Sequence, residues 1–282
     1  MSEPATEFVV RRILVALDAS AQSLAALEAA VVVAGGLGAE IEGLFVEDIN
    51  LMRLAMLPVA RHILYPSAAE EPFSRSLIEH ELKALARRAQ RSLALMAGRS
   101  GIRWSFRVVR GKVAVEIMAA ASGSDLLTVG KSGWSLARRM QLGSIAESAA
   151  VHAPKALLLV KQPLAVNRPV IALFDGSPLA EHALKAANRF GCTFPCPLTV
   201  FLATDSPQKA NSLARQVVRV INAKGAQPKF RLLLATGALH LADAVESEAG
   251  GLLVLARSYE RLPEKTIQHL IRLVSNSVLL VR

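Results

Sequence analysis

The sequence predicts an α/β fold: two tandem, doubly wound domains, each built on a five-stranded parallel sheet of the Rossmann-like kind. Short apolar runs alternate with stretches of helical periodicity, which is the pattern of β-α-β units. The same pattern starts again near residue 169 of the 282 residues. Hydrophobic residues make up 52% of the chain and aromatic residues 5%, a composition that suits helices packed on a buried parallel sheet.

The first half contains five apolar runs that are typical of strands, separated by segments with helical periodicity. The first run ends at Asp18, and Ser20 supplies an N-cap for the helix that follows. We expect Gly35, Gly36 and Gly38 to stop this helix. The predicted strands are 12–17, 40–46, 102–109, 125–129 and 156–160, and the predicted helices are 21–34, 73–98, 113–121 and 143–152.

The connection over residues 50–71 is longer and more apolar than a link between a strand and a helix requires. Long insertions of this kind often carry function. Two interpretations are open: the segment is a covered loop packed on the rim of the sheet, or it is a lid or a surface for a partner.

The second half repeats the order of elements. Its first strand ends at Asp175, the counterpart of Asp18, and Gly237 lies 126 positions after Gly111. A constant offset of this kind indicates an internal repeat. The predicted strands are 169–174, 198–203, 230–235, 252–256 and 277–281, and the predicted helices are 179–190, 206–224 and 239–248.

The repeat predicts two domains, one over residues 1–163 and one over 164–282. The formal net charge is +10, yet the chain has no dense basic tail and does not interleave basic with aromatic residues. Because a single-strand binder needs that interleaving, we expect no nucleic-acid partner. The basic residues of the 73–98 helix are interpreted as a solvated face, and they are Lys83, Arg87, Arg88 and Arg91.

The cysteines and the N-terminus indicate the compartment. Cys192 and Cys196 are one residue too far apart for a redox Cys-x-x-Cys, and no second pair exists for zinc, so we interpret them as buried or incidental thiols. The polar, acidic N-terminus is not a secretory signal, and no apolar run is long enough to span a bilayer. We expect a cytoplasmic protein with no membrane span and no metal-ligating residue.

A glycine motif follows the fourth strand. Gly130-Lys131-Ser132-Gly133 is followed nine residues later by Gly143-Ser144, where a helix begins. Glycine lets a backbone approach a ligand closely, and a helix N-terminus offers N–H groups to a phosphate. Ligands of parallel sheets bind beyond the carboxyl ends of the strands, so this turn and Asp18 face one crevice. Two plainer interpretations stay open: Asp18 only caps the first helix, and the glycines only form a tight turn.

The second half lacks this motif. At the 126-residue offset Ala256 replaces Gly130 and Tyr259 replaces Gly133, and Glu264 stands near the start of the final helix. A tyrosine would crowd a phosphate and a carboxylate would repel it. We therefore expect one nucleotide site, and we place it in the first half.

The motif Gly-x-x-Gly, nine residues, then Gly-Ser resembles the nucleotide motif of the universal stress protein family, and the duplicated chain is similar to the tandem form of that family. The resemblance covers nearly the whole sequence. It implies ATP binding, with Asp18 on the ribose hydroxyls and with Ala16 and Val46 near the adenine. The other implied nucleotide-binding residues, around the ribose and phosphates, are Val129, Gly130, Gly133, Gly143, Ser144 and Ile145.

The resemblance also implies an assembly and a metal. Mg²⁺ would reach the site through the phosphates. The two copies would pair through their final strands, 156–160 and 277–281, so that one chain imitates a homodimer. A homodimer of the whole chain is a further option.

The resemblance implies a cytoplasmic stress-response protein that binds ATP in its first domain and acts as a nucleotide-dependent regulator or chaperone-like binder. The alternative is a nucleotide-independent protein-interaction module that uses the 50–71 segment and the second domain. Phosphoryl transfer needs a positioned base, and none is evident beside the glycines. We therefore assign no catalytic residue and expect at most slow ATP hydrolysis, although the fold alone does not exclude an enzyme.

Overall fold

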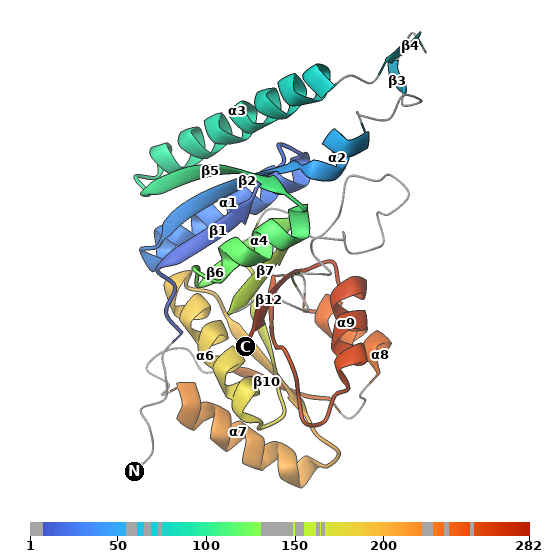
Figure 1. Ribbon diagram of the computed structural model, residues 1–282. Helices are drawn as coiled ribbons and strands as arrows, with labels where there is room; N and C mark the ends of the chain where they lie inside the picture. Colours follow the sequence, from blue (N-terminus) through green and yellow to red (C-terminus); the bar gives the residue numbers. More distant parts are fainter. Residues whose placement is uncertain are drawn as a thin grey trace.

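The computed structural model describes residues 8–54, 61–64, 69–72, 75–130, 149, 155–161, 164, 167–221, 228–233, 237–248 and 251–282. Strands and helices alternate along both halves of the chain (Figure 1). The strands are β1 (Arg12–Ala16), β2 (Glu40–Asp48), β3 (Arg61–Leu64), β4 (Ala69–Pro72), β5 (Trp104–Gly111), β6 (Leu126–Gly130), β7 (Ala156–Val160), β8 (Val170–Phe174), β9 (Leu198–Ala203), β10 (Lys229–Leu233), β11 (Leu252–Ala256) and β12 (Ser277–Val281). The helices are α1 (Ala21–Leu37), α2 (Ile49–Leu54), α3 (Arg75–Arg99), α4 (Val113–Ala121), α6 (Pro178–Thr193), α7 (Pro207–Ile221), α8 (Ala238–Glu246) and α9 (Glu264–Leu273).

The strands of both halves form one ten-stranded sheet in the order β10-β9-β8-β11-β12-β7-β6-β1-β2-β5. Within each half all neighbours are parallel, and the order β5-β2-β1-β6-β7 of the first half is repeated by β10-β9-β8-β11-β12. The predicted fold class of two tandem, doubly wound α/β units is confirmed. Strands near the centre of the sheet, such as β7 and β12, are buried along their whole length.

The two halves join through an antiparallel pair. Leu158 of β7 lies opposite Leu279 of β12, and Leu157 lies opposite Leu280. Leu158 and Leu279 are equivalent residues of the repeat, because both lie three positions before the matched endings Lys161 and Arg282. A pair of equivalent residues that face each other marks a local two-fold axis, as in a homodimer. The expected pairing of the final strands is confirmed.

Helices cover both faces of the sheet. In the first half α1 and α3 pack on one face, where Leu93 of α3 lies against Gly43 of β2. The shorter helix α4 packs on the opposite face, over β1, β2 and β5. Adjacent residues of a strand point to opposite faces, so Leu44 faces α4 when Gly43 faces α3. The face under α4 is the one that carries the candidate site described below.

Two details differ from the sequence prediction. Helix α1 continues through Gly35 and Gly36 to Leu37, and it ends at Gly38, which has the left-handed φ of 70° that glycine adopts easily. The 50–71 connection contains the short helix α2 and the antiparallel pair β3-β4. On α2, Leu51 and Leu54 are exposed, so at this point the connection is not a covered loop.

Gly36 is the residue where α1 meets the other half. A Cβ added at Gly36 would lie 2.6 Å from the ring of Phe194 and 2.7 Å from Cγ2 of Thr193, at the end of α6. Both distances are shorter than real Cβ contacts, so the ring would have to move. A Cβ at Gly35 would meet only Ile102, at 3.9 Å, which is an ordinary contact. The two adjacent glycines therefore have different structural roles.

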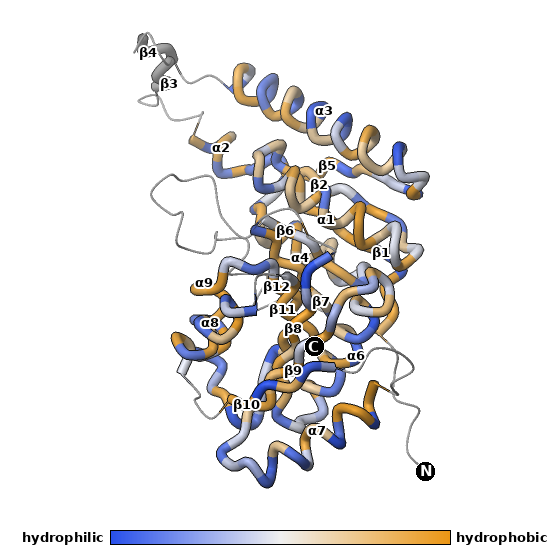
Figure 2. Tube along the Cα trace, turned by 180° about the vertical axis from the view of Figure 1, so that it is seen from behind, coloured by the Kyte–Doolittle hydropathy of each residue, from blue (hydrophilic) through white to orange (hydrophobic). Residues whose placement is uncertain are grey.

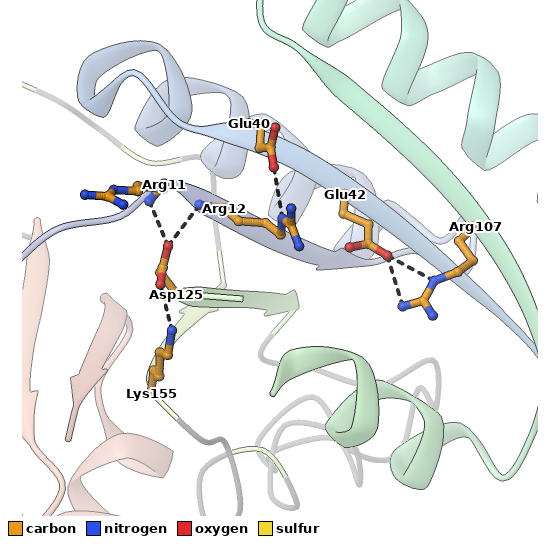
Figure 3. Close-up of polar contacts among 7 residues, drawn as sticks. All are labelled: Arg11, Arg12, Glu40, Glu42, Arg107, Asp125 and Lys155. Carbon is orange, nitrogen blue, oxygen red and sulfur yellow. Dashed lines mark hydrogen bonds and ion pairs between the residues drawn. The ribbon is translucent and has the colours of Figure 1, made fainter. Parts of the chain in front are cut away.

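A polar cluster ties the amino ends of the first-half strands together (Figure 3). Asp125 lies just before β6, and its Oδ2 accepts the N–H groups of Arg11 (2.9 Å) and Arg12 (3.1 Å). Its Oδ1 accepts from Nζ of Lys155 at 2.8 Å. Burial opposes ionisation of this carboxyl, but the hydrogen bonds from Lys155 and from the two backbone N–H groups outweigh it, so the pKa of Asp125 is lowered.

The glycine pair predicts opposite effects of one substitution. Gly36→Ala should lower the free energy of unfolding by about 1 kcal/mol, because overpacking against Phe194 exceeds the gain in helix propensity. Gly35→Ala should raise it by about 0.5–1 kcal/mol, because alanine favours a helix interior over glycine. Urea unfolding of both variants measures this. Two stabilising substitutions would show that α1 and α6 are not in close contact.

Asp125 predicts a pH-dependent contribution to stability. At pH 7, Asp125→Asn should lower the free energy of unfolding by about 1–2 kcal/mol, because charge-assisted hydrogen bonds are lost. A carboxyl whose folded pKa is depressed stabilises the protein above its unfolded pKa, about 3.9, and this contribution disappears as the pH falls through the folded pKa. The difference from the parent should therefore shrink below about pH 4. Glu79→Gln, in the exposed Arg75–Glu79 pair, is the control and should change little. A pH-independent difference would contradict the assignment.

Candidate functional site

The candidate site lies at the carboxyl ends of β1, β2 and β6. Ala16 pairs with Leu44 of β2, and Val15 pairs with Thr128, which places Ala16 beside Val129. Residues that lie side by side in a parallel sheet point to the same face, so Ala16, Val129 and Leu44 share the face under α4. Val46 lies two residues beyond Leu44 on the same face. The structure thus brings together the predicted floor of the site.

This floor is apolar and only partly covered. Val129 is buried, whereas Ala16, Val46 and Gly130 are half-buried. A cavity of about 420 Å³ lies on the same face, between the sheet and α4. It extends from Val109, the direct neighbour of Val46, toward the amino ends of the strands, where Arg12 and Gly123 line it. The residues of the floor do not line this cavity, so it is separate from the candidate site.

Gly130 lies at the opposite face, close to α1. A Cβ at this position would lie 2.9 Å from Cβ of Gln22 and 3.0 Å from its carbonyl oxygen. The backbone of α1 therefore approaches the end of β6 so closely that a larger residue would have to push it away. This contact gives Gly130 a structural role in addition to the predicted one.

A strained turn follows β1 and positions Asp18. Ala19 has a φ of 61°, a left-handed conformation that residues with a Cβ seldom adopt. The turn lets Oδ1 of Asp18 accept the N–H of Ser20 at 2.9 Å, and Ser20 then caps α1 by accepting the N–H of Ser23. Ser20 is the N-cap of α1, as the sequence predicts, so Asp18 is not the capping residue. Asp18 is exposed, and no described residue donates a hydrogen bond to its Oδ2.

The glycine loop lies outside the described residues. Residues 131–148 are not described, and this range includes the predicted phosphate-binding residues Gly133, Gly143, Ser144 and Ile145. Their roles stay predictions. The described part of the site is therefore its floor, with Ala16, Val46 and Val129, the end of β6 at Gly130, and its carboxylate, Asp18.

The second half has the same turn but a different occupant. Gly176, with a φ of 90°, takes the place of Ala19, and Asp175 takes the place of Asp18. Asp175 is buried, with an exposed fraction of 7%. Its Oδ1 accepts from the N–H and the hydroxyl of Ser177, at 3.0 and 2.6 Å. Its Oδ2 accepts the N–H groups of Glu260 and Arg261, at 2.8 and 3.3 Å.

Tyr259 fills the space between the strand ends of the second half. Its hydroxyl accepts the N–H of Ala256 at 2.8 Å and donates to the carbonyl oxygen of Leu173 at 3.3 Å. Ala256 is the counterpart of Gly130, and Leu173 is the counterpart of Ala16. Burial raises the pKa of the Tyr259 phenol far above its ordinary value, so the hydroxyl stays protonated and donates.

We call residues 257–263, which follow β11, the closing segment. It lies across the carboxyl ends of β8, β9 and β11, since Nη1 of Arg261 also reaches Oδ2 of Asp205 at 3.3 Å. Leu262 is buried, and α9 begins at Glu264. The sequence predicted that Tyr259 crowds this place, but it gave no signal that backbone N–H groups satisfy Asp175. A backbone N–H group is present in every residue except proline, so the residue types at 260 and 261 do not reveal these hydrogen bonds.

Among the described residues, no group of three or more His, Cys, Asp or Glu side chains has the proximity that a metal ion needs. None of the described helices combines the length with the apolar character needed to cross a bilayer.

Comparisons with known proteins agree with this geometry. Residues 10–161 match the model of the universal stress protein family. A universal stress protein from Archaeoglobus fulgidus is 19% identical, with a TM-score of 0.74 over 96% of this chain and 98% of that one. A putative universal stress protein from Pseudomonas aeruginosa is 14% identical, with a TM-score of 0.63 over 96% and 93%. A functionally unknown protein from the same species is 14% identical, with a TM-score of 0.59 over 96% and 92%. No curated protein matches the chain.

The two aspartates predict stability losses of different size. Asp175→Ala should lower the free energy of unfolding by about 2–4 kcal/mol, because it leaves several buried donors without an acceptor. Asp18→Ala should cost about 1 kcal/mol or less, because only the exposed bond from Ser20 is lost. Urea unfolding at pH 7 compares the two variants. Equal losses would show that the closing segment does not depend on Asp175.

Proposed function

We propose that this chain, which belongs to the universal stress protein family, binds one ATP in its first domain, residues 1–163, and none in its second, residues 164–282. ATP would then act as a ligand that sets the affinity for a protein partner, so that the chain serves in the cytoplasm as a nucleotide-dependent regulator or chaperone-like binder in a stress response. The observation that carries this proposal is the contrast between Asp18 and Asp175.

The two aspartates differ in whether their carboxylate oxygens are free to accept hydrogen bonds from a ligand. A carboxylate at the end of the first strand can accept two hydrogen bonds from the hydroxyls of a ribose. Asp18 is exposed, and no described residue donates to its Oδ2. Asp175 already receives two N–H groups from the closing segment on Oδ2. The second half thus supplies from its own backbone the donors that a ligand would supply in the first.

The remaining residues would surround the nucleotide in an order that follows the sheet. Ala16 and Val46 would face the adenine, because they lie on one apolar face at the carboxyl ends of β1 and β2. Val129 and Gly130 would lie under the ribose and the first phosphate. Gly133, Gly143, Ser144 and Ile145 would surround the phosphates with N–H groups and one hydroxyl, as helix N-termini do. Mg²⁺ would be held through the phosphate oxygens.

A regulatory role fits the described residues better than rapid turnover. Phosphoryl transfer needs a base that positions the nucleophile. In the described part of the site we assign one carboxylate to the nucleotide, Asp18, and we place it on the ribose, away from the phosphates. A bound nucleotide regulates only if it favours one conformation over another. At most slow hydrolysis is therefore expected.

A second candidate is a nucleotide-independent interaction module. The observation that favours it is the exposure of Leu51 and Leu54 on α2, next to α3. Apolar side chains exposed together often mark a partner surface. In this case partner binding would not change when ATP is added, and the nucleotide experiment below separates the two candidates.

The proposal predicts one ATP per chain and a dependence on Asp18. Isothermal titration with ATP and Mg²⁺ should give a stoichiometry of one. Asp18→Asn should weaken the affinity about tenfold or more, because a hydrogen bond to a charged group is worth about 1.5–3 kcal/mol. Glu28→Gln removes an exposed carboxylate from α1 and is the control, which should bind as the parent does.

Three results would overturn this proposal. A stoichiometry of two would show that the closing segment admits a nucleotide. An unchanged affinity in Asp18→Asn would remove this carboxylate from the site. If the parent chain binds no ATP at all, the interaction module becomes the better description.

A further inference from the structure

The positive charge of the chain gathers in one layer at the end of the sheet. Between residues 82 and 115 the sequence has nine Lys or Arg residues and no Asp or Glu, in a chain whose net charge is +10. This stretch covers most of α3 and all of β5, the outermost strand of the first half. Figure 1 shows α3 on the outside of the molecule, beyond β5.

Part of this charge is neutralised within the sheet. Arg107 forms an ion pair with Glu42 at 2.9 Å, and Arg110 forms one with Glu47 at 2.7 Å. These two arginines of β5 therefore serve the edge of the sheet. On α3 the carboxylate of Glu79 pairs with Arg75 at 2.9 Å, and this hydrogen bond is the main reason why the pKa of Glu79 is lowered.

Besides Lys83 and Lys112, five arginines of the stretch remain, and we call them the arginine face: Arg87, Arg88, Arg91, Arg99 and Arg103. All are exposed, and none forms an ion pair with another residue in the described part of the chain. Four of them lie on α3, whose opposite side is the buried stripe with Leu82, Ala89 and Leu93. Figure 2 shows the hydrophilic segments that recur along α3. From Arg87 to Arg99 the face is about 18 Å long, at 1.5 Å per helical residue.

The other end of the sheet provides an internal comparison. Helix α7 lies between β9 and β10 as α3 lies between β2 and β5, so the two helices are counterparts. On α7, Lys209 pairs with Asp205 at 3.1 Å. On β10, Lys229 and Arg231 both pair with the buried carboxylate of Glu248. Arg215 and Arg219 are then the exposed arginines of α7, so this end is far less charged.

The geometry points to a nucleic-acid backbone as the partner: we propose that the arginine face binds phosphates without reading the base sequence. Guanidinium groups match phosphate oxygens with two parallel hydrogen bonds, and a straight row of them fits a linear polyanion. An anionic membrane is the less suitable partner, because insertion needs a broad apolar face, and Leu95 is the one large apolar side chain exposed on α3 among the described residues.

This inference differs from the expectation drawn from the sequence. That expectation relied on the absence of a dense basic tail and of interleaved aromatic residues. The four arginines of α3 are spread over residues 87–99, and they come onto the side opposite the apolar stripe only when the helix forms and packs on the sheet. The proposal does not depend on nucleotide binding, since the arginine face and Asp18 share no residue.

A matched pair of double variants tests the proposal. Arg87→Gln/Arg91→Gln removes two charges one helical turn apart on α3, and Arg215→Gln/Arg219→Gln does the same on α7. Glutamine keeps helix propensity, and circular dichroism checks the fold. Fluorescence anisotropy of a labelled duplex of about 25 base pairs, without Mg²⁺ and from 50 to 200 mM KCl, measures affinity.

The parent should bind with a slope of log K against log salt of about −4 to −5, which corresponds to about five phosphate contacts. The α3 variant should lose about tenfold or more at 50 mM and about two units of slope, whereas the α7 variant should stay within about threefold. Asp18→Asn should bind the duplex as the parent does, which separates this test from the ATP proposal.

Three outcomes would overturn the inference. Equal losses in the two variants would show an effect of net charge alone. Absence of duplex binding at 50 mM KCl would exclude the partner class. Binding to anionic phospholipid vesicles, lost in the α3 variant, without binding to the duplex would assign the arginine face to a membrane surface instead.

Discussion

The antiparallel pairing of β7 with β12 is the contact on which the rest of the structure depends. Each of these strands ends its own parallel half-sheet, and each is buried along its length. Alone, either would expose unpaired N–H and C=O groups together with apolar side chains, which invites aggregation. Their pairing moves the free edges of the sheet to β5 and β10, where arginine and lysine side chains protect them. Helices α1 and α6 can then meet at Gly36 and Phe194, and the two crevices take fixed places on opposite sides of the junction.

Within this frame, one carboxylate has two different environments. At the end of β1, Asp18 is exposed beside an apolar floor, and at the end of β8, Asp175 is enclosed by the closing segment. Each is followed by a residue with a left-handed φ, Ala19 after Asp18 and Gly176 after Asp175. Ala19 keeps a conformation that favours glycine, and strain of this kind persists where the surrounding structure requires the geometry. The turn therefore belongs to the shared fold, and the residues after β11 decide whether the crevice is open to a ligand.

Much of the fold could be predicted because strands buried on both faces are continuous apolar runs. The strands at 156–160, 198–203, 252–256 and 277–281 have the predicted limits. The predicted end of α1 was wrong. Close packing against Phe194 requires a glycine at position 36 inside the helix, although glycine has a low helix propensity. The pair β3-β4 was missed because its strands have four residues each and no clear alternation of apolar and polar residues. The residues predicted for the floor share one face because the register of a parallel sheet requires it, and their role in binding stays a prediction. The capture of Asp175 by backbone N–H groups has no signature in side chains.

The union of the two halves in one chain has a consequence for how each half can change. Only nine residues separate Val160 of β7 from Val170 of β8, so the partner of β7 is always present at a high effective concentration. Dilution cannot separate the halves, as it can separate the subunits of a dimer. In a dimer of identical chains every substitution appears twice, once in each crevice. Here Tyr259 can fill the strand ends of one half while the other half carries a different residue at the equivalent position, so covalent linkage converts a symmetric scaffold into one whose two ends are free to specialise.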